Sequence, residues 1–387
     1  MSNSPELILV LNAGSSSLKL GLFDAATEAQ VAEESLDWST DDSPDVSDHA
    51  AALRHLLGAH DLSHVTAVGH RIVHGGTKYQ ASVRLDETVK AAVAELAELA
   101  PLHNPAALEG IAAAEALLPG VPQVGAFDTA FHSTLPPSAY LYAVPYAWYT
   151  DWGVRRFGFH GLSHAYCSDR AAAMLDRPLT GLRMVTCHLG NGCSLAAVAG
   201  GRSVATTMGF TPLEGLMMGT RSGSIDPGLL LHLIQHGYLD PAHLEDALNH
   251  ESGLKGIAGE SGDMRTVLAA REAGDARAAL ALDLFTARLR EGIAAMVAAL
   301  GGIDALVFTA GIGEHAASVR AAVVSRLDWM GVALDGPANA VAQPDADVTA
   351  ARGRVRVLVI HTREDLMVAR ETRRVLSGER KTGPQQA

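Results

Sequence analysis

Cysteine, basic residues and long apolar runs are scarce in this 387-residue chain, and each scarcity excludes a class of protein. The three cysteines, Cys167, Cys187 and Cys193, form no C-x-x-C pair and are odd in number, which disfavours a disulfide framework or a thiolate zinc site. Lys and Arg number 30 against 43 Asp and Glu, a formal net charge of −13, so the chain has no broad basic surface for nucleic acid or anionic lipid. Cations that face an anionic ligand must therefore be few and local.

Membrane and export signals are also missing. No apolar run reaches the roughly 18 residues of a spanning helix. The opening MSNSPELILV lacks the basic region and apolar run of a signal peptide. Hydrophobic residues make up 48% and charged residues 19%, which is the composition of a folding chain. We therefore expect a soluble, cytoplasmic protein with no membrane or nucleic-acid partner and a length suited to two domains.

Two glycine turns, far apart in the chain, each lie between apolar strand patterns. Asn12-Ala13-Gly14-Ser15 matches His188-Leu189-Gly190-Asn191, with the second turn about one residue longer. The match predicts a duplicated β-hairpin, although glycine turns between strands also look alike by chance. Strand and helix patterns alternate after each hairpin, which favours α/β layers. Elsewhere in the chain we expect a loop over 33–48. Further strands are expected in VTAVGHRIVHGG, VPQVGAFD, GGRSVATT, ALVFTAG and VRVLVI. Helices are expected near 87–99, 105–118, 226–236, 241–249, 275–300, from 315, and over 363–376.

The first turn, LNAGSSSLKL, is rich in small donors. On an extended strand Ser15, Ser17 and Lys19 share a face, so two hydroxyls and an ammonium would project together beside the amides that Gly14 frees. This arrangement suits phosphate oxygens, although the segment does not match the Walker pattern. A solvated hairpin is the alternative.

The second turn, Gly190-Asn191-Gly192, would let a polyphosphate approach the main chain. AGIGEHAASVR follows an apolar strand and fits the G-x-G-x-x-A dinucleotide pattern. That pattern also requires a second strand ending in an acidic residue, and RLDWMGVALDG makes a poor strand. A nicotinamide site is therefore the weaker interpretation, and these glycines would equally admit a nucleotide's sugar or base.

Several cations lie at strand ends or helix starts. Arg71 is in GHRIVHGG, and Arg221 precedes Asp226-Pro227, a pattern typical of a helix cap and first helical residue. An arginine in such a place can clamp an anion, although a structural arginine is the commoner case. His160 and His164 have a metal-like spacing, but the glutamate of H-E-x-x-H is absent, which makes zinc improbable.

Taken together, these motifs resemble the acetokinase family, within the group that includes hexokinase, actin and the Hsp70 ATPase. The resemblance runs from Leu7 to Thr372. It is carried by LNAGSSSLKL, GHRIVHGG, PLHNPAALEGI, AFDTAFHSTLP, RRFGFHGLSH, CHLGNGCSL, MGFTPLEGLMMGTRSGSIDPG, SGDMR, FTAGIGEH and EDLMVARET, in this order.

The resemblance implies reversible transfer of the γ-phosphoryl group of ATP to acetate, giving ADP and acetyl phosphate, with Mg²⁺ or Mn²⁺. Acetate is already an anionic nucleophile, so the obstacle is bringing an anion to a polyanion. By resemblance Arg71 holds the carboxylate, and Arg221 and His160 stabilise the transferring group. Asp128 matches a residue with an acid/base label in the family, and we expect it mainly to orient Mg²⁺ or Arg71. The remaining implied contacts are Asn12 and Glu364 with Mg²⁺; Lys19, Ser15, Ser17, His188, Leu189, Gly190, Asn191, Gly192, Asp263, Met264, Arg265, Gly311, Ile312, Gly313, Glu314 and His315 with the nucleotide; and Val73, Leu102, Phe159 and Pro212 with the acetate methyl group.

Two positions depart from the family pattern. His315 and Arg363 stand where asparagine is usual, which affects the detail of nucleotide contact and of local metal geometry. Neither change removes a charge that the chemistry requires.

The resemblance implies two duplicated α/β domains of the actin-like ATPase (ribonuclease H-like) type, with a nucleotide cleft between them and a homodimer formed through the second domain. We place the domains at 1–148 and 149–365, and expect 366–387 to hold the end of a helix that returns to the first domain, followed by a frayed polar tail. The alternatives are a propionate or butyrate kinase with the same chemistry, a dinucleotide-dependent oxidoreductase, and a non-catalytic ATP-binding switch.

Overall fold

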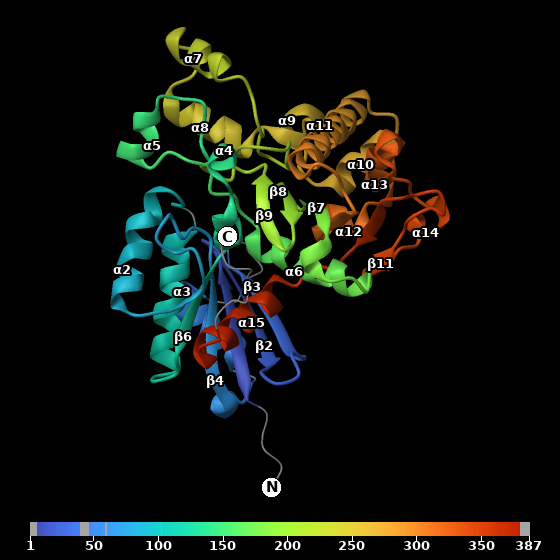
Figure 1. Ribbon diagram of the computed structural model, residues 1–387. Coiled ribbons are helices and arrows are strands. Elements are labelled where there is room, and N and C mark those ends of the chain that lie inside the picture. Colours follow the sequence, from blue (N-terminus) through green and yellow to red (C-terminus); the bar gives the residue numbers. More distant parts are fainter. Residues whose placement is uncertain (1–5, 39–45, 59, 102, 380–387) are drawn as a thin grey trace. The chain divides into compact units, whose positions relative to one another are not determined.

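The computed structural model describes residues 6–38, 46–58, 60–101 and 103–379, and its chain folds into two compact units (Figure 1). Unit 1 takes in the chain up to Phe131 and resumes at Arg363, whereas unit 2 is His132–Thr362. Each unit is built around one six-stranded sheet. Among the described residues, no helix combines the length and the apolar character needed to cross a membrane.

The unit 1 sheet has the strand order β3-β2-β1-β4-β6-β5. Strand β1 is antiparallel to β2 and parallel to β4, and β4 is parallel to β6. The apolar run of β1 is buried on both faces, as the unbroken pattern predicts. The strands are β1 (Leu7–Ala13), β2 (Ser17–Asp24), β3 (Gln30–Asp37), β4 (Val65–Ile72), β5 (Val83–Arg84) and β6 (Gln123–Phe127).

Helices cover both faces of this sheet. Leu7, Leu9 and Leu11 pack in one core with α1 (His49–Leu57) and α3 (Asn104–Leu117). Helix α15 (Glu364–Ser377) packs against β1, β4 and β6 on the other face, where Gly69 allows Val368 and Thr372 to approach the strand closely. Helix α2 (Glu87–Glu95) packs beside α3. The last helix thus brings Glu364 into unit 1, to the end of the sheet where β1 and β4 stop.

The unit 2 sheet repeats the unit 1 sheet strand for strand, with the order β9-β8-β7-β10-β12-β11. Strand β7 is antiparallel to β8 and parallel to β10, and β10 is parallel to β12. The duplication predicted from the two hairpins is therefore confirmed. The strands are β7 (Arg183–Leu189), β8 (Cys193–Ala199), β9 (Arg202–Thr206), β10 (Ala305–Thr309), β11 (Ala346–Asp347) and β12 (Arg356–Val359).

Two helices sandwich the centre of this second sheet. The long α11 (Ala276–Leu300) packs where Gly292 meets Leu195, and α6 (Gly161–Met174) packs on the opposite face, which carries Ser194. Asp226 caps α7 by accepting from Gly228 N at 2.8 Å, with Pro227 in the first turn, as its sequence predicts. The other helices are α4 (Pro137–Tyr140), α5 (Tyr146–Trp152), α7 (Pro227–Gln235), α8 (Pro241–His250), α9 (Gly253–Ala258), α10 (Met264–Glu272), α12 (Ala310–His315), α13 (Ala317–Val324) and α14 (Gly336–Ala340).

Three local predictions were wrong. Residues 33–37 belong to β3 rather than to a loop, because an exposed edge strand carries polar side chains and gives no apolar signal. The first turn, not the second, is the longer, since Ala13 pairs with Leu18 but Leu189 with Cys193. Ser15 lies in the turn and not on the strand face of Ser17 and Lys19, because β2 begins at Ser17.

The breaks between the two units do not coincide with the predicted domain boundaries. Residues 132–148 bond to unit 2: Thr134 Oγ1 donates to Ser203 O at 2.8 Å, and the Tyr142 hydroxyl donates to Glu214. Residues 363–365 begin α15 and pack with unit 1. The predicted boundaries at 148/149 and 365/366 thus differ from the breaks between the units.

Candidate functional site

Unit 1 has a pocket of about 360 Å³ at the end of the β1–β2 hairpin. Asn12, Gly14, Ser17 and Lys19 line it from the hairpin, and Arg71 from the end of β4. Parallel strands present their carboxyl ends at one edge of a sheet, so β1 and β4 deliver Asn12 and Arg71 to the same place. Val73 and His103 also line the pocket, whereas Leu102 lies outside the described residues.

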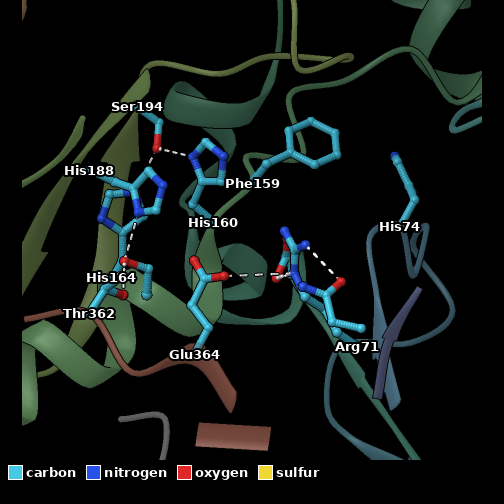
Figure 2. Close-up of polar contacts among 12 residues, drawn as sticks. Arg71, His74, Phe159, His160, His164, His188, Ser194, Thr362 and Glu364 are labelled. Carbon is cyan, nitrogen blue, oxygen red and sulfur yellow. Dashed lines mark hydrogen bonds and ion pairs between the residues drawn. The ribbon is translucent and has the colours of Figure 1, made fainter. Parts of the chain in front are cut away.

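Arg71 is held by oxygen atoms from three separate segments. Its Nη2 lies 2.5 Å and its Nε 3.3 Å from the two carboxylate oxygens of Asp128, and its Nη1 donates to Asn12 Oδ1 at 3.3 Å. Glu364 Oε2 lies 4.0 Å from Nε (Figure 2). Burial by itself would lower the pKa of Arg71, but Asp128 and Glu364 outweigh it and raise the pKa above the ordinary arginine value. The guanidinium is therefore fixed in orientation before any ligand arrives.

Lys19 is also held by carboxylates of its own unit. Its Nζ lies 2.7 Å from Glu33 Oε1 and 2.9 Å from Asp365 Oδ2. Burial lowers the pKa of the ammonium, but Asp365 and Glu33 more than compensate and raise it. Lys19 is 42% exposed, so these pairs are partly screened by water and an anion can still reach the charge.

Unit 2 has a pocket of about 550 Å³ between the second glycine turn and the starts of two helices. Asp263 caps α10 by accepting from Arg265 N at 2.8 Å, and Arg265 Nη2 returns to Asp263 at 2.6 Å. The pocket brings together eight of the predicted nucleotide residues: Gly190, Asn191, Asp263, Met264, Arg265, Gly311, Ile312 and His315.

Gly313 and Glu314 do not line this pocket, although they belong to the same predicted motif. The Glu314 carboxylate is buried and accepts from Ala310 N and Thr362 N, each at 2.9 Å, and contacts His361 Nδ1 at 2.7 Å. These bonds fix the start of α12 against the segment after β12. The nucleotide role of Glu314 and Gly313 stays a prediction, and a Cβ added at Gly313 would lie 3.3 Å from the Phe308 main chain.

The dinucleotide pattern has the strand and helix it requires, but not the second strand. Helix α12 follows β10 directly. The region RLDWMGVALDG contains a 3-10 turn over Asp328–Met330, and Val332 forms only an isolated bridge. The acidic residue of a dinucleotide site therefore has no strand end to occupy.

His160 and Arg221 meet at the second glycine turn. A side chain at Gly192 would place its Cβ 3.4 Å from both the Arg221 Nη1 and the His160 Nε2 atoms. His160 has φ +56°, a left-handed conformation that costs an L-residue of order 1–3 kcal/mol and often marks a functional position. Its ring stacks on His188, with centroids 4.1 Å apart.

Arg221 differs from Arg71 because it has no carboxylate partner among the described residues. Its Nη1 donates to Pro212 O at 3.4 Å and lies 4.0 Å from Met218 Sδ. Burial lowers the pKa of the guanidinium, but an arginine stays charged at neutral pH. A half-buried cation without a counter-ion favours the arrival of an anion.

Sequence reasoning missed the hydroxyl groups that hold the histidines. Ser194 Oγ lies 2.9 Å from His160 Nδ1 and 2.8 Å from His164 Nε2, and Ser163 Oγ lies 2.8 Å from His188 Nδ1. No sequence spacing links these residues, because sheet and helix bring them together. His160 and His164 therefore share one serine hydroxyl as a partner.

Oxygen atoms suited to a hard divalent cation gather around Arg71. Asn12 Oδ1 and the Glu364 carboxylate, from β1 and the start of α15, both contact this one side chain. Within the described part of the chain, no three His, Cys, Asp or Glu side chains form a metal-binding group. The donor set fits Mg²⁺, which is commonly held by one or two protein oxygens, with water and phosphate completing its shell.

Comparison with known proteins agrees with this geometry. The family model described as "Acetokinase family" matches residues 7–370. An acetate kinase of Gloeobacter violaceus is 50% identical over 94% of this chain and 98% of its own. The crystal structure of Porphyromonas gingivalis acetate kinase is 38% identical, with a TM-score of 0.90 over 96% of this chain and all (100%) of its own. A propionate kinase from Francisella tularensis is 35% identical, with a TM-score of 0.88 over the same shares of 96% and 100%. The fold is the two-domain actin-like ATPase fold, as predicted.

The buried His132 should make the free energy of unfolding depend on pH. Burial, above all, lowers its pKa to about 4, so between about pH 6.5 and 4 the unfolded chain binds a proton that the folded chain does not. The stabilisation is complete above about pH 6.5 and is lost as the pH falls towards 4. Between about pH 7.5 and 5 the parent should lose roughly 2 kcal/mol more unfolding free energy than His132→Gln. Urea denaturation at both pH values measures this, and an equal loss in both proteins would contradict the prediction.

Proposed function

The chain belongs to the acetokinase family, and from that premise we propose that it transfers the γ-phosphoryl group of ATP reversibly to acetate, giving acetyl phosphate and ADP. An acetate oxygen forms a bond to the γ-phosphorus while the bond from that phosphorus to the β–γ bridging oxygen breaks, and ADP leaves with the electron pair. No proton has to be removed from the nucleophile. The catalytic problem is therefore to align two anions and to stabilise charge on the transferring group.

The observation that carries this proposal is the position of Arg221. Gly190 and Asn191 line the unit 2 pocket, and the same turn continues to Gly192, beside Arg221 and His160. A nucleotide whose adenosine occupied the pocket would lead its phosphates along the turn amides toward a guanidinium for which the described residues supply no carboxylate partner. We assign Arg221 and His160 to the transferring phosphoryl group.

The unit 1 residues supply the second half of the proposed reaction. Arg71, fixed by Asp128, binds the acetate carboxylate, and Lys19 and Ser17 face the nucleotide phosphates. Asn12 and Glu364 hold Mg²⁺ or Mn²⁺, which when bound neutralises phosphate charge. We assign Val73, Phe159 and Pro212 to contact with the methyl group. We propose that both units supply residues to one phosphoryl transfer from ATP to acetate.

A kinase for propionate is the second candidate, because a propionate kinase has a TM-score of 0.88 to this chain. One methylene group in an apolar pocket is worth only about 1–3 kcal/mol, so the two activities differ by degree. Trapping the acyl phosphate with hydroxylamine, with ATP and Mg²⁺, should give kcat/KM highest for acetate and about 10- to 200-fold lower for propionate, with butyrate lower again. A higher value for propionate would identify the second candidate, and no acyl phosphate from any carboxylate would contradict both.

Arg221 gives a mutational prediction for the same assay. Arg221→Ala should lower kcat about a thousandfold, because it removes charge that acts on the transferring group. Arg221→Lys should recover only part of the loss, since an ammonium lacks the planar fork. Arg352→Ala, at an exposed arginine of unit 2, is the matched control and should leave kcat unchanged. Unchanged nucleotide-dependent turnover in Arg221→Ala would refute the assignment.

We also propose that the chain forms a cytoplasmic homodimer through unit 2. The support is a set of exposed apolar side chains on and beside two short helices, α5 and α7, an amount that a monomer rarely leaves in water. These side chains are Tyr146, Trp148, Trp152, Leu229, Leu231, Ile234 and Tyr238, between 40% and 69% exposed. Cys167, Cys187 and Cys193 are buried and form no disulfide, which suits a reducing compartment.

Charged residues on these helices should separate the dimer. The double change Trp152→Asp and Leu231→Asp places carboxylates on this apolar surface, so light scattering should report a mass near one chain instead of two. Val31→Asp, at an exposed apolar position of unit 1, is the control and should remain dimeric. A parent protein that is monomeric at micromolar concentration would disprove the proposal.

A further inference from the structure

Arg320 is the largest side chain among the described residues that is almost fully buried. It lies on α13, is 1% exposed and lines neither of the pockets described above. Burial lowers the pKa of its guanidinium, but an arginine stays charged at neutral pH. A buried charge is costly unless hydrogen bonds replace its water. The oxygen atoms that accept from Arg320 are therefore held firmly to it.

Two of these oxygen atoms belong to the end of α12, the six-residue helix that precedes α13. Arg320 Nη1 donates to Gly313 O at 2.9 Å and to Glu314 O at 2.8 Å. The last turn of a helix supplies no donors for its own carbonyls, and the final bond of α12 runs from Ala316 N to Ile312 O at 3.0 Å. A guanidinium only donates and a carbonyl only accepts, so the direction of both bonds is fixed.

Asn339, on α14, holds the other side of the guanidinium. Arg320 Nε donates to Asn339 Oδ1 at 2.7 Å, and Nη2 donates to Asn339 O at 2.9 Å. The Asn339 amide nitrogen donates in turn to Ala317 O at 2.9 Å. The amide orientation is unambiguous, because an arginine on one side can only donate and a carbonyl on the other can only accept. Arg320 therefore joins α12, α13 and α14 (Figure 1).

Helix α12 forms one wall of the unit 2 pocket of about 550 Å³. Three residues of α12 and the residue after it line this pocket: Gly311, Ile312, His315 and Ala316. A helix of six residues is too short to be stable by itself, so its position depends on the contacts at its two ends. The Glu314 carboxylate, which accepts from Ala310 N, fixes the start, and Arg320 fixes the end.

We propose that Arg320 is a positioning residue for the nucleotide, whose guanidinium holds the end of α12 where Gly311 and Ile312 can contact the adenosine. Because Arg320 is buried and lies outside the pocket lining, it acts only through α12. This inference rests on the proposed function for the identity of the ligand. The fixing of α12 is a property of the free protein.

Arg320→Lys tests the proposal, with Arg290→Lys as a matched control. An ammonium keeps the charge but has one nitrogen atom, which cannot contact the end of α12 and both Asn339 oxygen atoms together. Arg290 is half-buried on α11, and its Nη1 donates to Ala322 O of α13 at 3.1 Å. The control thus alters one arginine–carbonyl bond to the same helix α13 without touching α12.

Hydrogen exchange in the free protein, followed by mass spectrometry on peptides covering residues 310–319, reports how firmly α12 is held. Arg320→Lys should speed exchange of the α12 amides about 10- to 100-fold, because the helix loses charge-assisted hydrogen bonds at its end. The amides of α10, which also lines the pocket, should keep the parent's exchange rates in this variant. Arg290→Lys should match the parent at both helices.

In the acyl phosphate assay, Arg320→Lys should raise the KM for ATP about 10-fold, because apparent affinity falls with the fraction of molecules in which the pocket wall is formed. At saturating ATP, kcat and the KM for acetate should change by less than about threefold, since bound nucleotide restores the wall. Asn339→Ala, which removes one acceptor of Arg320, should give the same pattern with a smaller rise. Arg290→Lys should leave all three constants unchanged.

Unchanged exchange of α12 in Arg320→Lys would overturn the proposal. So would an equal rise of both KM values, because the effect would then reflect a general loss of stability and not the position of α12. If the parent makes no acyl phosphate, the proposed function fails, and hydrogen exchange on the same samples still decides whether Arg320 holds α12. Calorimetry with ADP gives a direct check, since its affinity should fall by the same factor as the KM for ATP rises, and an affinity equal to the parent's contradicts the role.

Discussion

Repulsion between anions is the constraint that organises both units. The chain has a net charge of −13, so its own carboxylates compete with anionic ligands for its few cationic side chains. Some of these cations must stay unpaired if an anionic ligand is to bind them. Unit 1 holds Arg71 and Lys19 in ion pairs with Asp128, Glu33 and Asp365. Unit 2 leaves Arg221 half-buried, near a carbonyl, a thioether and His160, with no carboxylate partner in the described part of the chain. The first arrangement fixes a cation in place, and the second keeps its charge available for a ligand.

Duplication explains how one hairpin serves two kinds of chemistry. At the same register of the repeated sheet, Asn12 pairs with Lys19 in unit 1, whereas His188 pairs with Ser194 in unit 2. The first pair places a metal-compatible oxygen beside an ammonium. The second places a serine where it can hold the neighbouring His160 and His164. The two units share the same backbone arrangement but differ in their side chains. In the proposed function, unit 1 binds the acetate carboxylate and unit 2 stabilises the transferring phosphoryl group.

Most of the fold and many of the candidate residues could be predicted from the sequence. The two hairpins, the alternation of strands and helices, and the motifs around Arg71, Gly190 and Arg221 are local patterns. The structure places Arg71 and Gly190 at pockets, and Arg221 beside the second glycine turn. The failures have local physical reasons. Strand β3, expected as a loop, is an exposed edge strand without an apolar pattern. The nucleotide role of Glu314 stays a prediction, and its buried carboxylate accepts a hydrogen bond from Thr362 N, far along the chain.

The sequence by itself determined the repeated strand pattern, the scarcity of cations and the residue types available for phosphoryl chemistry, because these depend on composition and short spacing. Only the tertiary structure decided which cation is paired and which is not, and that Ser194 and Thr186 reach histidines on a helix packed against their strands. These relations join residues through sheet pairing and helix packing, and no periodicity along the chain records them. The physical reason is that a side chain's charge and donor state are set by its spatial neighbours, which sequence distance does not fix.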